Sequence, residues 1–86
     1  MDYEVTLLAA AERDLRKLPP ELRPRLVEGL KSLKQPRQPS VKKLQGSEDR
    51  WRLRVGDYRI IYRIDDTERK VIVIRIAHRR DVYRPT

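Results

Sequence analysis

The sequence predicts one α+β domain, residues 1–86, in which an N-terminal helical hairpin packs on one face of an antiparallel sheet, in the order β-α-α-β-β-β. Three observations support this fold class. Leucines recur at helical spacing on both sides of the pair Pro19-Pro20. Two segments of alternating character flank the pair Gly56-Asp57, and a third segment that is almost wholly apolar follows them.

The N-terminal part of the chain begins with a short strand and continues as two helices. Residues 3–7 alternate apolar and polar side chains, which is typical of a strand. The spacing then becomes helical, with one apolar face formed by Leu8, Ala11, Leu15 and Leu18. Pro19-Pro20 ends this helix because proline lacks the amide donor, and Pro20 or Pro24 can occupy the first turn of the next helix.

The second helix is expected to bury a stripe formed by Leu22, Leu26, Leu30 and Leu33. Gly29 lies inside this helix and weakens it by roughly 1 kcal/mol relative to alanine. Residues 35–49, rich in Pro, Gln, Ser and Gly, are expected to form a connecting loop.

The second half of the chain predicts a meander of three strands. Arg50–Val55 and Tyr58–Ile64 are separated only by Gly56-Asp57, which indicates a tight primed turn. Lys70–Ile76 follows as an interior strand, because it is apolar nearly throughout.

Side chains along a strand alternate between the two faces of the sheet. We expect the helices to pack on an apolar face formed by Trp51, Leu53, Val55, Tyr58, Ile60, Tyr62, Ile64, Ile72, Ile74 and Ile76. The opposite face, named here the arginine face, carries Arg50, Arg52, Arg54, Arg59, Arg63 and Arg75, with Ile61, Val71 and Val73 beside them.

The predicted turn places two of these arginines directly opposite each other. If Gly56-Asp57 is the whole loop, Arg54 pairs with Arg59, and like charges so placed destabilise a sheet. Guanidinium groups bind phosphate through two parallel hydrogen bonds, so the cluster favours a phosphate ligand. The alternative is an ordinary solvated face, on which arginine stems cover apolar surface and their heads lie in water.

The composition agrees with an anionic partner. The chain has 21 Lys and Arg against 13 Asp and Glu, for a formal net charge of +8. Such a balance favours nucleic acid, an acidic membrane surface or an acidic protein as partner, although abundant charge also suits a surface stabilised by salt-bridge networks. With no cysteine and one histidine, His78, the chain offers neither disulfides nor a zinc site, and we expect no metal or other cofactor.

No stretch approaches the roughly 20 apolar residues of a membrane span, and the N-terminus lacks the basic region of a signal peptide. We therefore expect a cytoplasmic protein without a membrane partner. The chain closes with residues 77–86, AHRRDVYRPT, which can fold over the end of the arginine face. There a tyrosine can stack on a base, although His78 can equally cap a strand end and Tyr83 can clasp the sheet.

At this point the chain resembles a known family. The segments KKLQG (42–46), WRLRVGDYRIIYRID (51–65) and AHRRDVY (77–83) are similar to the RelE family of prokaryotic toxins, and ERDLRKLP (12–19) fits as well. The resemblance implies a RelE-like fold and a ribonuclease that cuts messenger RNA in the ribosomal A site without a metal. In that reaction the ribose 2′-hydroxyl attacks the adjacent phosphate.

The resemblance also implies roles for individual residues. Arg52 and Arg54 match the basic pair before the tight turn and would position the substrate electrostatically. Arg59 and Arg79 would stabilise charge on the phosphate, and Tyr83 matches the terminal tyrosine, which would stack on or orient a nucleotide. Further RNA contacts are expected from Lys42, Lys43, Arg50, Arg63, Arg75 and Arg80.

Two matters stay open at the level of sequence. Many members carry lysine where this chain has Arg52 and Arg54, and arginine hardly serves as a base, so the proton acceptor is His78 or Tyr83. The function itself has three alternatives: a ParE-like toxin that acts on DNA gyrase, an RNA-binding module without catalysis, and a degenerate toxin. The resemblance implies an acidic antitoxin as partner, beside the ribosome and messenger RNA.

Overall fold

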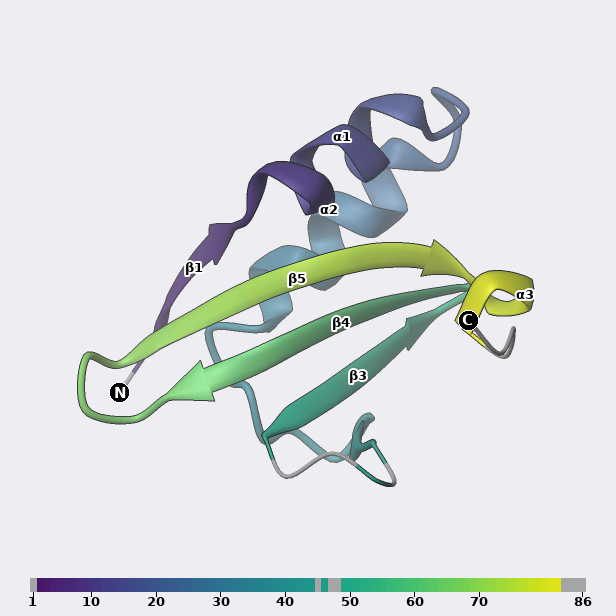
Figure 1. The fold of residues 1–86 in the computed structure, drawn as a ribbon. Helices are drawn as coiled ribbons and strands as arrows, with labels where there is room; N and C mark the ends of the chain where they lie inside the picture. Colours follow the sequence, from purple (N-terminus) through teal and green to yellow (C-terminus); the bar gives the residue numbers. More distant parts are fainter. Residues whose placement is uncertain (1, 45, 47–48, 83–86) are drawn as a thin grey trace.

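The computed structural model describes residues 2–44, 46 and 49–82 of the chain. The helices and strands of this part are β1 (Glu4–Leu7), α1 (Ala9–Lys17), α2 (Arg23–Ser32), β2 (Val41–Lys43), β3 (Arg50–Val55), β4 (Tyr58–Asp65), β5 (Lys70–His78) and α3 (Arg79–Val82). Figure 1 shows α1 and α2 together behind the sheet, whereas α3 lies at the end of β5. The predicted α+β class with a helical hairpin is confirmed.

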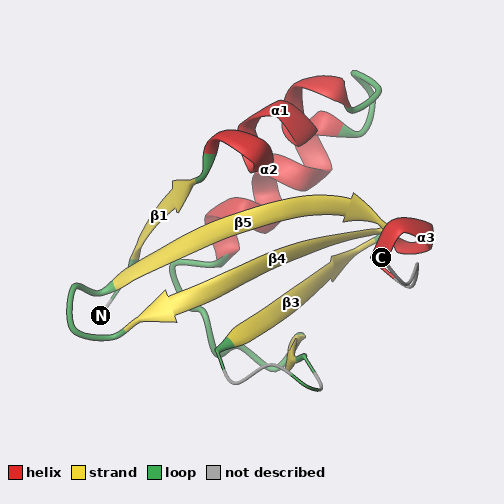
Figure 2. Cartoon of the chain, viewed as in Figure 1, coloured by secondary structure: helices red, strands yellow, loops and turns green. Residues whose placement is uncertain are grey.

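The sheet has five strands in the order β1-β5-β4-β3-β2 and is mixed (Figure 2). β1 pairs with β5 in parallel, and the other neighbours are antiparallel. The prediction of a purely antiparallel sheet is therefore wrong in one pairing. The hairpin of α1 and α2 connects β1 at one edge of the sheet to β2 at the other edge.

The prediction of a continuous loop over residues 35–49 is also wrong, because it contains β2. This strand of three residues extends β3 at the edge of the sheet, with Lys42 opposite Arg52. A strand this short lacks an alternating pattern that the sequence could display. The order of elements is thus β-α-α-β-β-β-β, with the short α3 added at the end of β5.

The helical hairpin begins and ends close to its predicted limits. α1 ends at Lys17 before Pro19-Pro20, and Pro24 lies in the first turn of α2. α1 packs on β5 and β1, while α2 packs on β3. None of the helices in the described ranges is long and apolar enough to cross a membrane.

A β-bulge reverses the predicted faces of part of β5. Tyr62 pairs with Val73 and Ile61 pairs with Arg75, so one extra residue of β5 lies between these pairs. Val71 and Val73 consequently point to the helices and are fully buried, whereas Ile72 lies on the arginine face. Uninterrupted alternation from Ile76 predicted the reverse, and that prediction is wrong for the part of the strand before the bulge.

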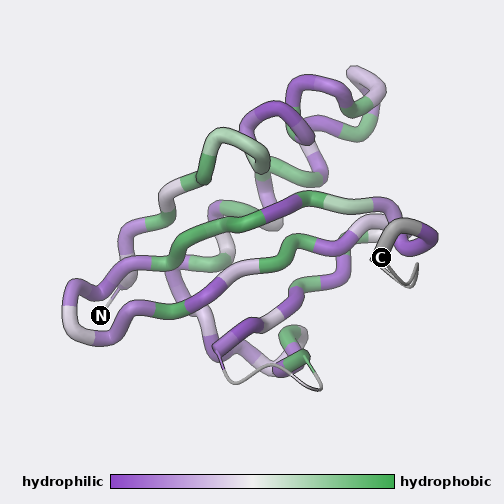
Figure 3. Tube along the Cα trace, in the orientation of Figure 1, coloured by the Kyte–Doolittle hydropathy of each residue, from purple (hydrophilic) through white to green (hydrophobic). Residues whose placement is uncertain are grey.

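The core lies between the helical hairpin and the sheet. Its fully buried members of greatest volume are Tyr62, Leu26, Leu33, Ile60, Val71 and Val73. Figure 3 shows β5 as hydrophobic along most of its length, with a short hydrophilic interruption. The Tyr62 hydroxyl donates a hydrogen bond of 2.6 Å to the carbonyl oxygen of Pro36, and burial raises the pKa of this phenol.

The presence of glycine at position 29 is explained by a tertiary contact that the sequence did not reveal. A Cβ atom built on Gly29 would lie 2.9 Å from Cγ2 of Val55 and 3.2 Å from Cδ1 of Ile60. Glycine therefore lets α2 approach the sheet closely, at the expense of helix propensity.

Replacement of Gly29 by alanine is expected to lower the free energy of unfolding by about 1–2 kcal/mol through overpacking. Helix propensity alone predicts a gain of roughly 1 kcal/mol. Urea denaturation measures the sign. The control is Gly29→Ala in a Val55→Ala background, which removes the nearest methyl group and should abolish the penalty. Stabilisation by the single Gly29→Ala substitution would show that the contact is unimportant.

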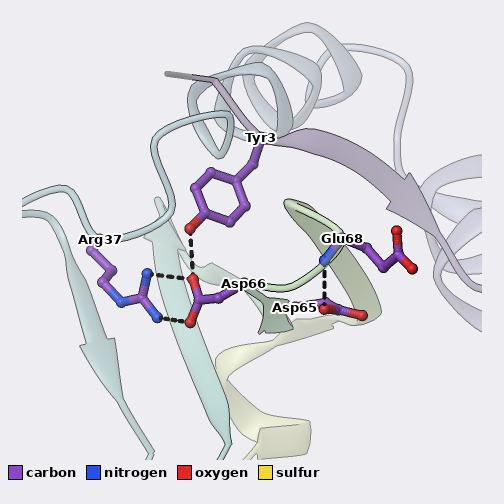
Figure 4. Close-up of polar contacts among 5 residues, drawn as sticks. All are labelled: Tyr3, Arg37, Asp65, Asp66 and Glu68. Carbon is purple, nitrogen blue, oxygen red and sulfur yellow. Dashed lines mark hydrogen bonds and ion pairs between the residues drawn. The ribbon is translucent and has the colours of Figure 1, made fainter.

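A polar cluster fastens the β4–β5 turn to the N-terminal strand and to the segment before β2 (Figure 4). Asp66 accepts two hydrogen bonds from Arg37, at 3.0 and 2.9 Å, and one of 2.6 Å from the Tyr3 hydroxyl. These donors, Arg37 first, lower the pKa of Asp66 to about 2. The Arg37 guanidinium also lies 5.8 Å from the ring centroid of Trp51.

Because the pKa of Asp66 is lower in the folded chain than in the unfolded one, its contribution to stability is complete above about pH 4 and is lost as the pH falls towards about 2. Asp66→Asn should therefore flatten the dependence of the urea midpoint on pH over this interval. Glu68→Gln, in the same turn, is the matched control and should keep the slope of the parent chain. An unchanged slope in Asp66→Asn would contradict the role of the cluster.

Candidate functional site

The arginine face is ordered in three cross-strand rows by the register of the sheet. The first row contains Arg54, Arg59 and Ala77; the second contains Lys42, Arg52, Ile61 and Arg75; the third contains Arg50, Arg63 and Ile72. Each row thus holds a cation of β3 directly opposite at least one residue of β4. The predicted pairing of Arg54 with Arg59 is confirmed, and Arg50 pairs with Arg63 in the same way.

The turn between β3 and β4 fixes this register. Val55 pairs with Tyr58, so Gly56 and Asp57 are the whole loop, as predicted. Gly56 has a φ of +59°. Asp57 does not have a positive φ, because Arg69 is the one non-glycine residue in the described ranges that has one. A positive φ at the first central residue alone is the pattern of a type II′ turn, whose twist suits a hairpin. The turn therefore holds Arg54 and Arg59 side by side.

Arg59 is the most deeply buried charged residue of the described chain, with 4% of its surface exposed. Its neighbours across the sheet are Arg54 on one side and Ala77 on the other. A buried guanidinium opposite a second guanidinium is costly, since like charges repel and burial removes water from the ion. Guanidinium groups bind phosphate through two parallel hydrogen bonds, so a pair of neighbouring arginines favours an anionic ligand.

α3 begins at the same end of the sheet, next to the β3–β4 turn (Figure 1). The backbone N–H of Arg79 donates a hydrogen bond of 2.8 Å to the carbonyl oxygen of Asp57. α3 contacts both β5 and β4. The structure therefore brings the backbone of Arg79 to the turn that separates Arg54 from Arg59, and the Arg79 and Arg80 side chains are exposed there.

His78 does not lie on the arginine face. It pairs with Tyr58, and the two rings meet edge to face with centroids 5.2 Å apart. Both rings line cavities of about 290 and 170 Å³ together with residues of α1 and α2, which cover the opposite face. The expectation that His78 folds over the arginine face is therefore not met, because β5 extends through His78 and alternation directs its ring to the helices.

Arg75 belongs to the arginine face by register, but its side chain is held by α1. Its Nε and Nη2 atoms donate hydrogen bonds of 2.7 and 3.1 Å to the carboxylate of Asp14. β1 pairs with β5 only as far as Val73. Beyond Val73, Asp14 contacts the edge of β5, where its carboxylate also accepts a hydrogen bond of 2.9 Å from the N–H of Ile76. Arg75 thus forms an ion pair with α1, and its side chain does not join the other arginines of the face.

Asp14 is the residue of this region that sequence reasoning missed. Burial raises the pKa of its carboxyl, but hydrogen bonds from Arg75 and Ile76 and nearby positive charge outweigh burial and lower the pKa overall. A signal was present in the sequence: Asp14 is acidic and lies beside the apolar stripe of its helix. Its partner is 61 positions away, however, and only the fold defines it.

The remaining predicted residues are distributed over the arginine face and its margins. Arg50, Arg54 and Arg63 are exposed and Arg52 is half-buried. Lys42 shares the second row with Arg52, whereas Lys43 pairs with Trp51 and so alternates to the other side. Tyr83 lies outside the described residues. In the described ranges, no three acidic, histidine or cysteine side chains gather as metal ligands.

Comparison with known proteins identifies the architecture. The family model described as the ParE toxin of the type II toxin–antitoxin system parDE matches residues 5–83. Toxin RelG of Mycobacterium tuberculosis is 39% identical over 89 residues, which cover 98% of this chain and 99% of that protein. Toxin RelE of the same organism is 36% identical, over 95% of this chain and 87% of that protein.

The solved structures agree with the sequences. A chain of the toxin–antitoxin complex RelBE2 from Mycobacterium tuberculosis superimposes with a TM-score of 0.82 and 34% sequence identity. The superposition covers 91% of this chain and 99% of that chain. This chain therefore shares its fold with a chain of a toxin–antitoxin complex.

Proposed function

The chain belongs to the ParE/RelE superfamily as a RelE-family toxin of a toxin–antitoxin system, and from this premise we propose that it is an endoribonuclease that cleaves messenger RNA on the ribosome. The proposed reaction needs no metal: the ribose 2′-hydroxyl attacks the adjacent phosphate, a 2′,3′-cyclic phosphate forms, and the 5′-oxygen leaves. The substrate is an RNA because only RNA supplies the 2′-hydroxyl.

The observation that carries the proposal is the pair Arg54 and Arg59 at the end of the sheet. Cyclisation places additional negative charge on the phosphate in the transition state, and fixed guanidiniums can stabilise it. The burial of Arg59 excludes water from one side of this charge and so strengthens the interaction. Arg79, whose backbone is anchored to the turn, is proposed to supply a third cation.

The other cations of the arginine face serve to bind the RNA backbone in this proposal. Lys42, Arg50, Arg52 and Arg63 lie in the rows beyond the Arg54–Arg59 pair, along a path that a single strand could follow. Binding of this kind depends steeply on salt, because each neutralised phosphate releases counterions. The same cations can meet ribosomal RNA.

The position of His78 among residues of the helical hairpin speaks against its use as the base for a phosphate on the arginine face. Tyr83, the other candidate from the sequence, is proposed as the residue that orients the nucleotide and takes the proton.

An antitoxin is the proposed protein partner. The similar RelBE2 structure is a toxin–antitoxin complex, and the net charge of +8 in this chain favours an acidic partner. Inhibition is proposed to follow from coverage of the arginine face or from bulk that prevents entry into the ribosome.

The proposal is tested by induced expression in a bacterial host, followed by mapping of the 5′ ends of transcripts. The expected result is growth arrest with new 5′ ends inside translated regions, at spacings that follow the reading frame. The name of the matching family model makes the ParE-like alternative, which acts on DNA gyrase, the relevant contrast. Growth arrest with gyrase-dependent DNA breaks and no new 5′ ends would replace the RNA proposal by that alternative.

A further inference from the structure

His78 is the one histidine of the chain, and the proposed mechanism assigns it no chemical step. Its Nδ1 atom accepts a hydrogen bond of 3.3 Å from the backbone N–H of Arg80. Since α3 begins at Arg79, His78 is the N-cap and Arg80 is the second residue of the helix. An N-cap side chain that accepts this N–H satisfies one of the amide donors that every helix leaves without an intrahelical partner.

A second contact completes this attachment. The N–H of Arg79 donates to the carbonyl oxygen of Asp57, so the first two amides of α3 are both occupied. One contact ties α3 to the β3–β4 turn, and the other ties it to the last residue of β5. The imidazole itself is held by the edge-to-face contact with Tyr58. Together these contacts set the position of α3 relative to Arg54 and Arg59.

We infer that His78 is a positioning residue: its neutral ring caps α3 and so holds Arg79 beside the Arg54–Arg59 pair, and protonation of the ring releases α3 and lowers activity. The inference rests on the proposed ribonuclease function for its effect on activity, but not for its effect on α3.

The chemistry follows from the two ring nitrogens. An imidazole that accepts through Nδ1 carries its single proton on Nε2, and the imidazolium form has no acceptor left. Histidine is the side chain that ordinarily changes charge between pH 5 and 8. A positive ring would also face the partial positive charge at the start of α3.

Charged side chains of both signs lie around the ring. Arg25 of α2 and Lys17 of α1 each line one of the two cavities that His78 also lines, and both oppose a positive charge there. Asp14 of α1 and Asp57 of the turn would favour it, but Asp14 is already bonded to Arg75 and to the Ile76 amide. Tyr58 contributes only its ring edge-to-face contact.

Two amide substitutions separate the cap from general-base catalysis. The Oδ1 atom of asparagine can take the place of Nδ1 and accept the Arg80 amide, but asparagine cannot take a proton near neutrality. Glutamine places its polar atoms about one bond further out, where Nε2 lies, and alanine has no acceptor. The four chains to compare are the parent, His78→Asn, His78→Gln and His78→Ala.

The first measurement is the rate of messenger RNA cleavage on programmed ribosomes from pH 5.5 to 8.5, divided by the rate of His78→Asn at each pH. At pH 7.5 we expect His78→Asn to keep the parent rate within about threefold, and the other two variants to lose about 5- to 10-fold, as for the loss of one cap. On acidification the rate of the parent should fall relative to that of His78→Asn. If His78→Asn is as inactive as His78→Ala at every pH, the ring is a base and the inference is overturned.

The second measurement does not need activity. The protection of the Arg80 amide against hydrogen exchange, measured by NMR in the full chain, should fall on acidification in the parent and remain constant in His78→Asn. Equal protection in both chains over the whole range overturns the inference. This readout holds even if the parent cleaves no RNA, so failure of the cap and failure of the ribonuclease proposal can be told apart.

Discussion

Replacement of Arg59 by glutamine is expected to lower the rate of messenger RNA cleavage by about 100- to 1000-fold, the usual effect of removing one fixed group that stabilises transition-state charge. Arg59 is the buried member of the Arg54–Arg59 pair, at the end of the sheet where α3 begins. Its loss should reduce the rate at saturating ribosome concentration, because the charge it meets develops mainly in the transition state. Single-turnover cleavage on programmed ribosomes measures this.

Arg63→Gln is the matched control for that measurement. Arg63 lies on the same strand and the same face, is exposed, and pairs with Arg50 two rows away. It is expected to contact a phosphate. Its loss should therefore weaken the binding of RNA and reduce the salt dependence of that binding, while the rate at saturation stays unchanged. Thermal unfolding establishes that both variants are folded. If Arg59→Gln retains the parent rate while Arg63→Gln loses it, the site lies elsewhere on the face.

Asp14→Ala is expected to lower the free energy of unfolding by about 2–3 kcal/mol, because hydrogen bonds to a charged group are lost and the Ile76 amide keeps no protein acceptor. The Asp14 side chain is 15% exposed, so water replaces its contacts only in part. Asp14→Asn should lower the free energy of unfolding by less, since its amide oxygen can still accept the Ile76 N–H. Urea denaturation at neutral pH distinguishes the two variants.

The same ion pair gives a prediction for Arg75. Since Asp14 holds this side chain at the edge of β5, Arg75→Ala should leave RNA cleavage within about threefold of the parent and lower stability by about 1 kcal/mol or less, as for a partly exposed pair. The pKa of Asp14 is lowered, so its contribution to stability is present at neutral pH and is lost on acidification. A large loss of cleavage in Arg75→Ala, with unchanged stability, would contradict this prediction and indicate that Arg75 binds RNA.

The sequence alone determined the helical hairpin, the β3–β4 hairpin and the opposition of Arg54 and Arg59. These features depend on local rules: the leucine spacing, the two prolines, the Gly-Asp turn and the alternation of side chains along a strand. Each rule acts over a few residues. The bounds of α1 and α2 confirm the helical hairpin, and the pairing of β3 with β4 confirms the other two predictions.

The tertiary structure decided what depends on residues far apart in the chain. The bulge in β5 reversed the faces of Val71 and Val73, and the direction of β1 made the sheet mixed. The fold also pairs the Arg75 side chain with the Asp14 carboxylate and places His78 on the side of the sheet opposite the arginine face. The physical reason is the same in each case: a local pattern fixes how side chains alternate, but the partner across a sheet edge, and any residue inserted into the ladder, are fixed only when the whole chain packs.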